Sequence, residues 1–407
     1  MRSRRALSIL ASLGLMTSGA AAAAPAQADA APQEVLFVAN NWDGTASVLS
    51  SGADLAPVGE INVIPDREQR MREIYRDPIR LAAFLVIRQT VGEGHDQFAD
   101  DMYTTPDGSS LVVSRPSFAD VVSISLATGE VEWRFQVAGV RADHMAVSPD
   151  GTQVAVSAST GNRVHVLDIE TGAEAGSFPT GDKPHENVYT SDGLLWNMSI
   201  GEVNNSFDDP ALDFLKGDRV ITVADAETFE VVREIDMRDR LDDAGLGHLS
   251  DAVRPATFSP DESKLYFQVS FFGGFLEYDV ATDRITRTKT LPAVFDGPRT
   301  EMVNDSRHHG LTMQPSGEHL CVAGTMDDYA VVVDRETLET GPLVDVDKPY
   351  WSTVTGDGGA CVVSESGSDQ VTSIDFETGQ KVASVPVGDH PQRVRLGTVP
   401  AGWSGVG

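Results

Sequence analysis

Short apolar segments rich in β-branched residues recur along most of this chain, and each has the length of one β-strand. Polar turn sequences containing Gly, Pro, Asp or Thr separate them. Clear examples are residues 121–126, 154–157, 164–169 and 265–269. Beyond the first thirty residues, no segment approaches the roughly 20 apolar residues that a membrane-spanning helix needs. The pattern predicts an all-β chain built from successive hairpins.

Two turn motifs alternate between these segments at a nearly constant distance. The first resembles Ser-Pro-Asp-Gly and ends at Gly108, Gly151, Gly193, Glu262, Gly317 and Gly358. The second ends at a threonine, usually within Asp-x-x-Thr, at Thr128, Thr171, Thr228, Thr282, Thr337 and Thr378. The distance from the first motif to the threonine is 20 residues in five of the six copies. Repeats of about 40–50 residues made of short strands and tight turns are typical of a β-propeller, with one four-stranded blade per repeat.

Six complete blades fit between about residues 97 and 388. Residues 390–397 resemble an innermost strand without a following blade, and residues 35–40, 45–50 and 57–63 resemble three strands without an innermost partner. Joining the two ends of the chain would make a seventh blade and leave only short, protected sheet edges. We therefore predict an all-β, seven-bladed propeller of four-stranded antiparallel blades, with one blade shared by the N- and C-terminal strands.

The repeat resembles that of the secreted YncE-like propellers, which carry YVTN repeats. The resemblance is carried by residues 144–157, HMAVSPDGTQVAVS, and by residues 184–188, PHENV. It covers nearly the whole chain after residue 30, and it implies blade architecture while saying little about activity. Departures include Thr-Gly-Asp-Gly at residues 355–358 in place of Ser-Pro-Asp-Gly, and several long insertions.

Four insertions interrupt the repeats at residues 64–94, 202–217, 236–250 and 292–306. Each lies either between blades or between the second and third strands of a blade, and in an up-and-down blade both kinds of connection emerge on the same face. Residues 67–90 have helical character, and Pro78 should divide them into two segments. Because binding groups usually lie on loops carried by a rigid scaffold, we expect the inserted face to carry the functional site. The helical insertion could cover the channel mouth or merely pack at its rim.

Residues 1–30 have the form of a signal sequence, with Arg2, Arg4 and Arg5 before an apolar run and small-residue cleavage sites near Ala28 and Ala30. We expect general secretory export, with the twin-arginine route as an alternative, and a secreted, periplasmic or cell-surface product. The formal net charge is −30, and removal of residues 1–30 leaves 28 basic against 60 acidic side chains. Such an acidic surface argues against nucleic-acid binding and against membrane insertion.

Cys321 and Cys361 are the two cysteines of the chain. They occupy nearly equivalent places after two consecutive first turn motifs, four residues past Gly317 and three past Gly358. Equivalent places on neighbouring blades point their side chains the same way around the ring, so we expect two buried free thiols rather than a disulfide.

A ring of polar residues is predicted at the channel mouth, where the innermost strands begin. The position eight residues before the end of each first motif, with the matching position of the seventh blade, gives Asp100, Asp143, His185, Arg254, His309, Tyr350 and Gln392. Next to them in sequence are Asp101, His144, Glu186, His308, Trp351 and Arg393, with His390 nearby. As candidate ligand-binding residues we take Asp100, Asp143, Arg254, Tyr350, Trp351, Gln392 and Arg393.

Imidazole and carboxylate groups at such a mouth suit a divalent metal ion. The candidate metal ligands are His185, Glu186 and His309, with His308 as a further possibility. Arg254 would then hold a carboxylate or phosphate of the substrate, and Tyr350 or His144 would transfer protons. Against this interpretation, the ring contains no known metal-binding spacing, and a histidine that begins an innermost strand can simply bond to the next blade.

The sequence thus predicts an exported propeller, expected to be monomeric, that binds a small molecule or peptide segment at its inserted face. The alternative is a metal-dependent lyase or hydrolase with a His/Glu metal site at the channel mouth. Quinone-dependent redox chemistry is the weaker hypothesis, because the chain has no Cys-x-x-Cys-His haem motif. An interaction scaffold also fits a propeller.

Overall fold

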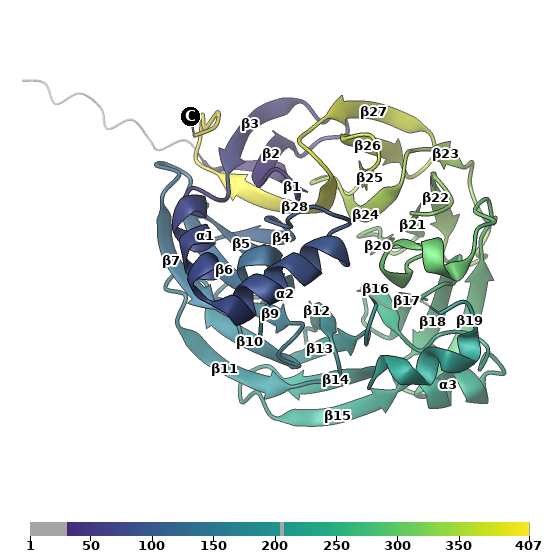
Figure 1. The fold of residues 1–407 in the computed structure, drawn as a ribbon. Coiled ribbons are helices and arrows are strands. Elements are labelled where there is room, and N and C mark those ends of the chain that lie inside the picture. The colour runs from purple at the N-terminus through teal and green to yellow at the C-terminus, as the bar shows by residue number, and fades with distance from the viewer. Residues whose placement is uncertain (1–30, 204–206, 407) are drawn as a thin grey trace, which may run out of the picture. The chain divides into compact units, whose positions relative to one another are not determined.

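Seven four-stranded antiparallel sheets follow one another around a ring in the computed structural model (Figure 1). The structure describes residues 31–203 and 207–406, so the predicted signal sequence, residues 1–30, lies outside the described part. The predicted fold class, an all-β seven-bladed propeller, is confirmed.

Each blade runs outward from the channel in strand order. The blades are β4 (Asp101–Thr104), β5 (Ser110–Arg115), β6 (Asp120–Ser125) and β7 (Val131–Gln136); β8 (Ala142–Val147), β9 (Gln153–Ala158), β10 (Arg163–Asp168) and β11 (Glu174–Pro179); β12 (Pro184–Tyr189), β13 (Leu194–Ser199), β14 (Val220–Asp225) and β15 (Val231–Asp236); β16 (Val253–Phe258), β17 (Lys264–Val269), β18 (Gly274–Asp279) and β19 (Arg284–Thr290); β20 (Gly310–Met313), β21 (His319–Gly324), β22 (Tyr329–Asp334) and β23 (Val344–Asp345); and β24 (Pro349–Val354), β25 (Ala360–Glu365), β26 (Gln370–Asp375) and β27 (Lys381–Pro386).

The two ends of the chain meet in the seventh blade, as the sequence predicts. It combines β28 (Pro391–Val399) as innermost strand with β1 (Gln33–Asn40), β2 (Thr45–Ser50) and β3 (Pro57–Asn62). β1 pairs antiparallel with β28, with Val35 opposite Gly397 and Leu36 opposite Leu396. This pairing closes the ring.

The recurrent turn residues fold the hairpins through side-chain hydrogen bonds. In the first motif, Ser148 Oγ donates to Asp150 Oδ1 over 2.7 Å, and Gly151 has a φ of +74°, a value that favours glycine. In the second motif, Asp168 Oδ1 accepts from both the backbone N and Oγ1 of Thr171, at 2.8 and 2.6 Å. The acidic residues of the turns therefore have a structural role, since their oxygens are used within the hairpin.

The apolar core lies between adjacent blades rather than within any one sheet. One cluster joins β13, β14 and β15 to β16, β17 and β18, and others bridge the remaining neighbours. The innermost and middle strands are largely buried, while the outermost strands alternate between exposed and half-buried residues. This packing places the beginning of every innermost strand around one central opening.

The first insertion forms two helices, α1 (Arg67–Arg76) and α2 (Pro78–Gln89), and α2 lies across the opening of the ring in Figure 1. Asp77 separates them with an extended backbone, and its side chain caps α2 by accepting from the backbone N of Ile79 and Arg80. The third insertion carries a short helix, α3 (Met237–Asp243), and the second and fourth carry 3-10 helices at Pro210–Lys216, Arg299–Glu301 and Val303–Asp305. Within the described residues, no helix has the length and apolarity needed to cross a bilayer.

Cys321 and Cys361 form a disulfide between β21 and β25, with their Cα atoms 6.1 Å apart. The expectation of two free thiols is wrong. The one-residue difference in their distance from the preceding turn explains the error, because successive side chains of a strand point to opposite faces of the sheet. One cysteine therefore faces the following blade while the other faces the preceding one.

Candidate functional site

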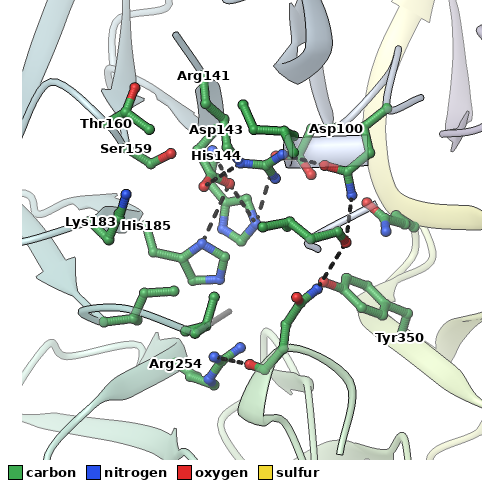
Figure 2. Close-up of a pocket in the computed structure, with 17 residues that line it drawn as sticks. Asp100, Arg141, Asp143, His144, Ser159, Thr160, Lys183, His185, Arg254 and Tyr350 are labelled. Carbon is green, nitrogen blue, oxygen red and sulfur yellow. Dashed lines mark hydrogen bonds and ion pairs between the residues drawn. The ribbon is translucent and has the colours of Figure 1, made fainter. Parts of the chain in front are cut away.

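The predicted ring residues converge at the mouth of the channel (Figure 2). A cavity of about 60 Å³, which we call the mouth chamber, is lined by six of the seven: Asp100, Asp143, His185, Arg254, Tyr350 and Gln392. Each is at least nine-tenths buried. The seventh, His309, lies directly behind His185, with 3.2 Å between the two Nε2 atoms. The strand starts of different blades thus bring together groups that lie far apart in sequence.

The insertions supply the other walls of the mouth chamber. Ile87 of α2 and Val91 just beyond it line the chamber, as do Val203 from the second insertion and Asn304 from the fourth. Asn304 Nδ2 donates to the backbone O of Val91 over 3.3 Å, which joins two insertions at this point. The inserted segments therefore cover the polar ring with an apolar roof.

Two contacts hold the segment that follows α2 in place. Arg88 and Asp96 form an ion pair of 2.5 Å across the loop. The ring of Trp42 lies between the rings of His95 and His390, with centroid distances of 3.8 Å on both sides and nearly parallel planes. Because Trp42 and His390 belong to the shared blade, these stacks attach the end of the helical insertion to the propeller.

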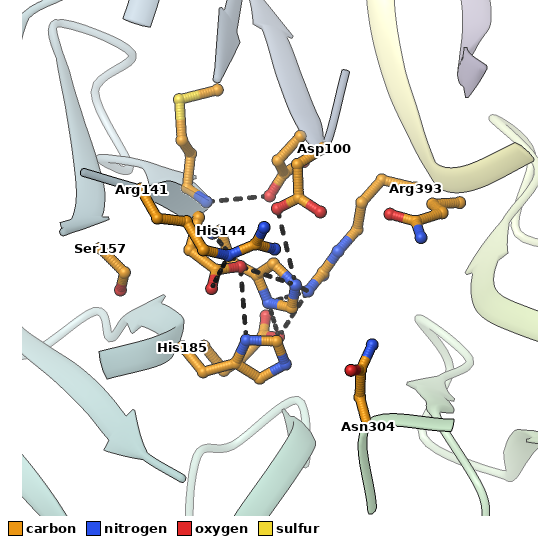
Figure 3. Close-up of polar contacts among 12 residues, drawn as sticks. Asp100, Arg141, His144, Ser157, His185, Asn304 and Arg393 are labelled. Atoms are coloured by element: carbon orange, nitrogen blue, oxygen red, sulfur yellow. Dashed lines mark hydrogen bonds and ion pairs between the residues drawn. The ribbon is translucent and has the colours of Figure 1, made fainter. Parts of the chain in front are cut away.

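A second layer of charged groups lies next to the chamber and further along the channel (Figure 3). His144 Nδ1 lies 3.1 Å from Glu186 Oε2, and Arg393 Nη2 donates to the same oxygen over 3.1 Å. The Arg393 guanidinium also contacts both ring nitrogens of His144 and stacks on Trp351, with Cζ 3.5 Å from the ring centroid. Asp101 forms a bidentate ion pair with Arg395 at 2.8 Å. The buried charges of this layer are thus mutually paired.

Burial and neighbouring charges shift the pKa values of these groups in opposite directions. Burial raises the pKa of Asp100 well above its usual value, and the adjacent Asp143 adds to the effect. Burial alone would also raise the pKa of Asp143, but Arg141, His185 and Arg393 together outweigh it and lower the pKa to about 2. Burial likewise lowers the pKa values of His185 and His309, which keeps both imidazoles neutral at pH 7.

Arg254 is held by the protein rather than free to bind a ligand with its whole guanidinium. Its Nε donates to Ser270 Oγ at 2.9 Å, its Nη1 to Ser306 Oγ at 2.5 Å, and its Nη2 to the backbone O of Asn304. Arg254 therefore fixes the fourth insertion to the ring while lining the chamber.

The candidate metal ligands named from the sequence do not form one set. His185 and His309 are adjacent, whereas Glu186 lines a second cavity further along the channel together with Trp351. His308 Nε2 lies 2.9 Å from Asp327 Oδ2, in the turn between β21 and β22 of the same blade. Among the described residues, a different group is spaced closely enough to hold a metal ion: one ligand atom each from Asp143, His144 and His185 lies within 4.8 Å of the others. The two candidate proton-transfer groups, Tyr350 and His144, both line the chamber.

Sequence reasoning missed two basic residues that line the chamber, Arg141 and Lys183. The sequence does contain a pattern that could have identified them, at the position two residues before each ring residue. The residues at this position in the seven blades are mostly basic, although the chain as a whole is strongly acidic: Phe98, Arg141, Lys183, Ala252, Arg307, Lys348 and His390. Lys183 reaches the mouth with a positive φ of 56° and pairs with Glu202 at 3.3 Å.

Comparison with known proteins supports the fold and goes no further. No family model and no curated protein matches the sequence. Among solved structures, the chain is similar to a propeller structure from Kuenenia stuttgartiensis hydrazine synthase, with a TM-score of 0.55 and 19% identity over 72% of this chain and 88% of that chain. Identity this low shows a shared propeller architecture only. Membership of the YncE-like family stays a prediction.

Proposed function

We propose that this protein is an exported propeller that binds a small anion in the mouth chamber beneath α2. The observation that carries the proposal is the enclosure of Arg141, Lys183 and Arg254 in one covered chamber of a protein whose net charge is −30. Basic groups gathered in a cleft of low dielectric create a local positive field that the overall charge does not predict.

The size of the chamber favours a small ligand over a peptide segment. Its volume of about 60 Å³ compares with roughly 10–15 Å³ for one water molecule in the same measure. Ile87 and Val91 cover it, so a peptide would have to displace the end of α2. An anion of a few heavy atoms, such as a short carboxylate or inorganic phosphate, fits without that change.

The charges lining the chamber favour an anion over a cation in its upper part. Lys183 is the most accessible of the basic groups, with 23% of its side chain exposed, and its partner Glu202 is itself partly exposed. Asp100 and Asp143 lie deeper and are balanced by Arg141, whose Nε is 3.6 Å from Asp143 Oδ2. Lys183 is therefore the group best placed to meet an incoming anion.

The experiment uses residues 31–407 and a panel of probes consisting of acetate, oxalate, malonate and inorganic phosphate. A ligand that binds the folded state raises the melting temperature, and calorimetry then gives its affinity. We expect at least one probe to stabilise the wild type and to lose affinity in Lys183→Ala. The matched control is Lys381→Ala, because Lys381 lies on the exposed outer strand β27. If no probe binds, or if Lys183→Ala binds as well as the wild type, the proposal is wrong.

A metal-dependent enzyme is the second candidate function, favoured by the convergence of Asp143, His144 and His185. Tyr350 would be its proton donor rather than its base, because burial raises the pKa of this phenol above its usual value. A lyase or hydrolase of this kind would also need the anionic part of its substrate to enter the same chamber.

A further inference from the structure

His185 Nδ1 faces the carboxylate of Asp143 without a hydrogen-bond partner among the described residues. The distance from this nitrogen to Asp143 Oδ1 is 3.4 Å, and both side chains are more than nine-tenths buried. A buried polar atom without a partner is costly, so its surroundings need an explanation.

The hydrogen bonds behind His185 fix which of its nitrogens carries the proton. His309 Nδ1 lies 3.2 Å from the backbone O of Tyr350, and a carbonyl oxygen only accepts, so this nitrogen must carry hydrogen. In a neutral His309, Nε2 is then an acceptor. His185 Nε2, 3.2 Å away, must be the donor between them. A neutral His185 therefore presents a lone pair on Nδ1 to a carboxylate, which is also an acceptor.

His144 lies on the other side of Asp143, and its Nδ1 is 3.1 Å from Glu186 Oε2. With the proton on Nδ1, this contact is a hydrogen bond to Glu186 and Nε2 is an acceptor, which the Arg393 guanidinium contacts in this structure. His144 Nε2 lies 3.5 Å from Asp143 Oδ1 and 3.7 Å from Asp100 Oδ2, an oxygen that also has no hydrogen-bond partner among the described residues. Two imidazole nitrogens and two carboxylate oxygens thus lie close together.

Two of the spacings among these atoms are close to those in a metal coordination shell. Zinc binds imidazole and carboxylate at about 2.0–2.1 Å in a tetrahedron, whose edges are then about 3.3–3.4 Å long. The two measured edges from Asp143 Oδ1, at 3.4 and 3.5 Å, agree with this value. The second nitrogen of each histidine is held by Glu186 or His309, as is usual for histidines that bind metals.

We infer that Asp143, His144 and His185 bind a divalent transition-metal ion at the floor of the mouth chamber, with Asp100 or a bound anion completing its coordination. Two imidazoles and a carboxylate suit zinc, and also iron(II) or manganese. The inference deepens the proposed function, because a cation here would anchor the small anion expected above it. The ligand set differs from His185, Glu186 and His309, of which only His185 is retained.

Arg393 is the cation that competes for this place. Its guanidinium contacts the ring of His144, donates to Glu186 and stacks on Trp351. Metal binding at His144 Nε2 requires the guanidinium to keep its contacts with Glu186 and Trp351 while leaving the nitrogen free. The free energy of moving the guanidinium away from His144 Nε2 therefore lowers the metal affinity.

The test measures metal alone, in buffer free of the anionic probes. Residues 31–407 are treated with EDTA, dialysed and titrated with Co²⁺, whose visible absorption reports its coordination geometry, and Zn²⁺ is then added in competition. We expect one Co²⁺ per chain, displaced by Zn²⁺, and a higher melting temperature with metal.

His185→Gln should abolish stoichiometric binding, because its amide reaches the position of Nε2 and keeps the bond to His309 while removing Nδ1. His309→Ala should weaken binding by about 10–100-fold, as expected for loss of an outer partner.

His248→Ala is the matched control, because His248 is exposed and outside the chamber. Circular dichroism and the metal-free melting temperature show whether each variant folds, and Asp143→Asn offers a second ligand change if His185→Gln does not. Retention of wild-type affinity in His185→Gln or Asp143→Asn, or no stoichiometric metal in the wild type, would overturn the inference. Lys183→Ala should keep the metal and lose the anion, so the two proposals can fail separately.

Discussion

Cys321 in β21 and Cys361 in β25 are joined by a disulfide that connects the second strands of two neighbouring blades. Both side chains are fully buried within one apolar cluster. The bond closes a loop with a sequence separation of 40 residues. It therefore acts as a covalent link between consecutive blades.

Replacing both cysteines with alanine should lower the free energy of unfolding by about 2–4 kcal/mol. The chain-entropy model gives about 4 kcal/mol for a loop of this length, and the small buried cavities add little. Urea unfolding of the oxidised wild type and of the double variant measures the difference. Equal stability of the two proteins would show that the link contributes nothing.

Arg254 should contribute mainly to the stability of the fold. Arg254→Lys keeps the charge but cannot make all three hydrogen bonds to Ser270, Ser306 and Asn304, so buried acceptors lose their donor. We expect the free energy of unfolding to fall by about 2–4 kcal/mol. Lys183→Ala should change it by less than about 1 kcal/mol, because its ion pair is partly exposed. Chemical denaturation of both variants checks this contrast.

The sequence predicted the ring of the chamber because its members share one position in a repeated structure. Counting eight residues back from each turn identified Asp143, His185 and Arg254 without any knowledge of contacts. Counting by repeat position gave wrong predictions where a shift of one residue moves a side chain to the opposite face of a strand. It misplaced the two cysteines, which are offset by one position, and it grouped His308 with His309, although His308 contacts Asp327 in the β21–β22 turn.

The hydrogen-bond partners could not be predicted from the repeat. Pairing of His144 with Glu186, and of Arg254 with Ser306, depends on how side chains from different blades and insertions meet in three dimensions. The roof formed by Ile87 and Val91 depends on the path of an irregular insertion. Helical segments on either side of Pro78 were predictable, but the place where α2 ends over the chamber was not.

Acid should destabilise this propeller through its buried neutral histidines. The pKa of His309 is lowered well below its usual value by burial and by Arg254, so between pH 6.5 and the folded-state pKa the unfolded chain binds the extra proton. The free energy of unfolding then rises with pH in this window, and the contribution of His309 is lost as the pH falls from 6.5 towards 5.

The measurement is the slope of the unfolding free energy between pH 7.5 and pH 5. His309→Gln should flatten the slope by up to one proton, or about 1.4 kcal/mol per pH unit. His248→Ala serves as the control, because this exposed side chain has no buried surroundings. An identical slope in His309→Gln and the wild type would contradict the assignment. The comparison of variants isolates His309 from Asp100 and Glu186, whose raised pKa values act in the opposite direction.

The stacks of Trp42 on His95 and His390 should control how often the mouth chamber opens. They attach the segment after α2, which includes Val91, to the shared blade. Stacked aromatic pairs contribute about 0.5–1.5 kcal/mol each. Removing both in Trp42→Ala should therefore quicken local amide exchange in residues 91–98 by roughly 5- to 150-fold.

Trp403→Ala is the control, since Trp403 bonds to Leu126 O away from the chamber. Faster opening should also speed the entry of any bound anion, which stopped-flow mixing would detect. If exchange in residues 91–98 is the same in Trp42→Ala and the wild type, the roof is held by other contacts, with the Arg88 and Asp96 ion pair as the first alternative.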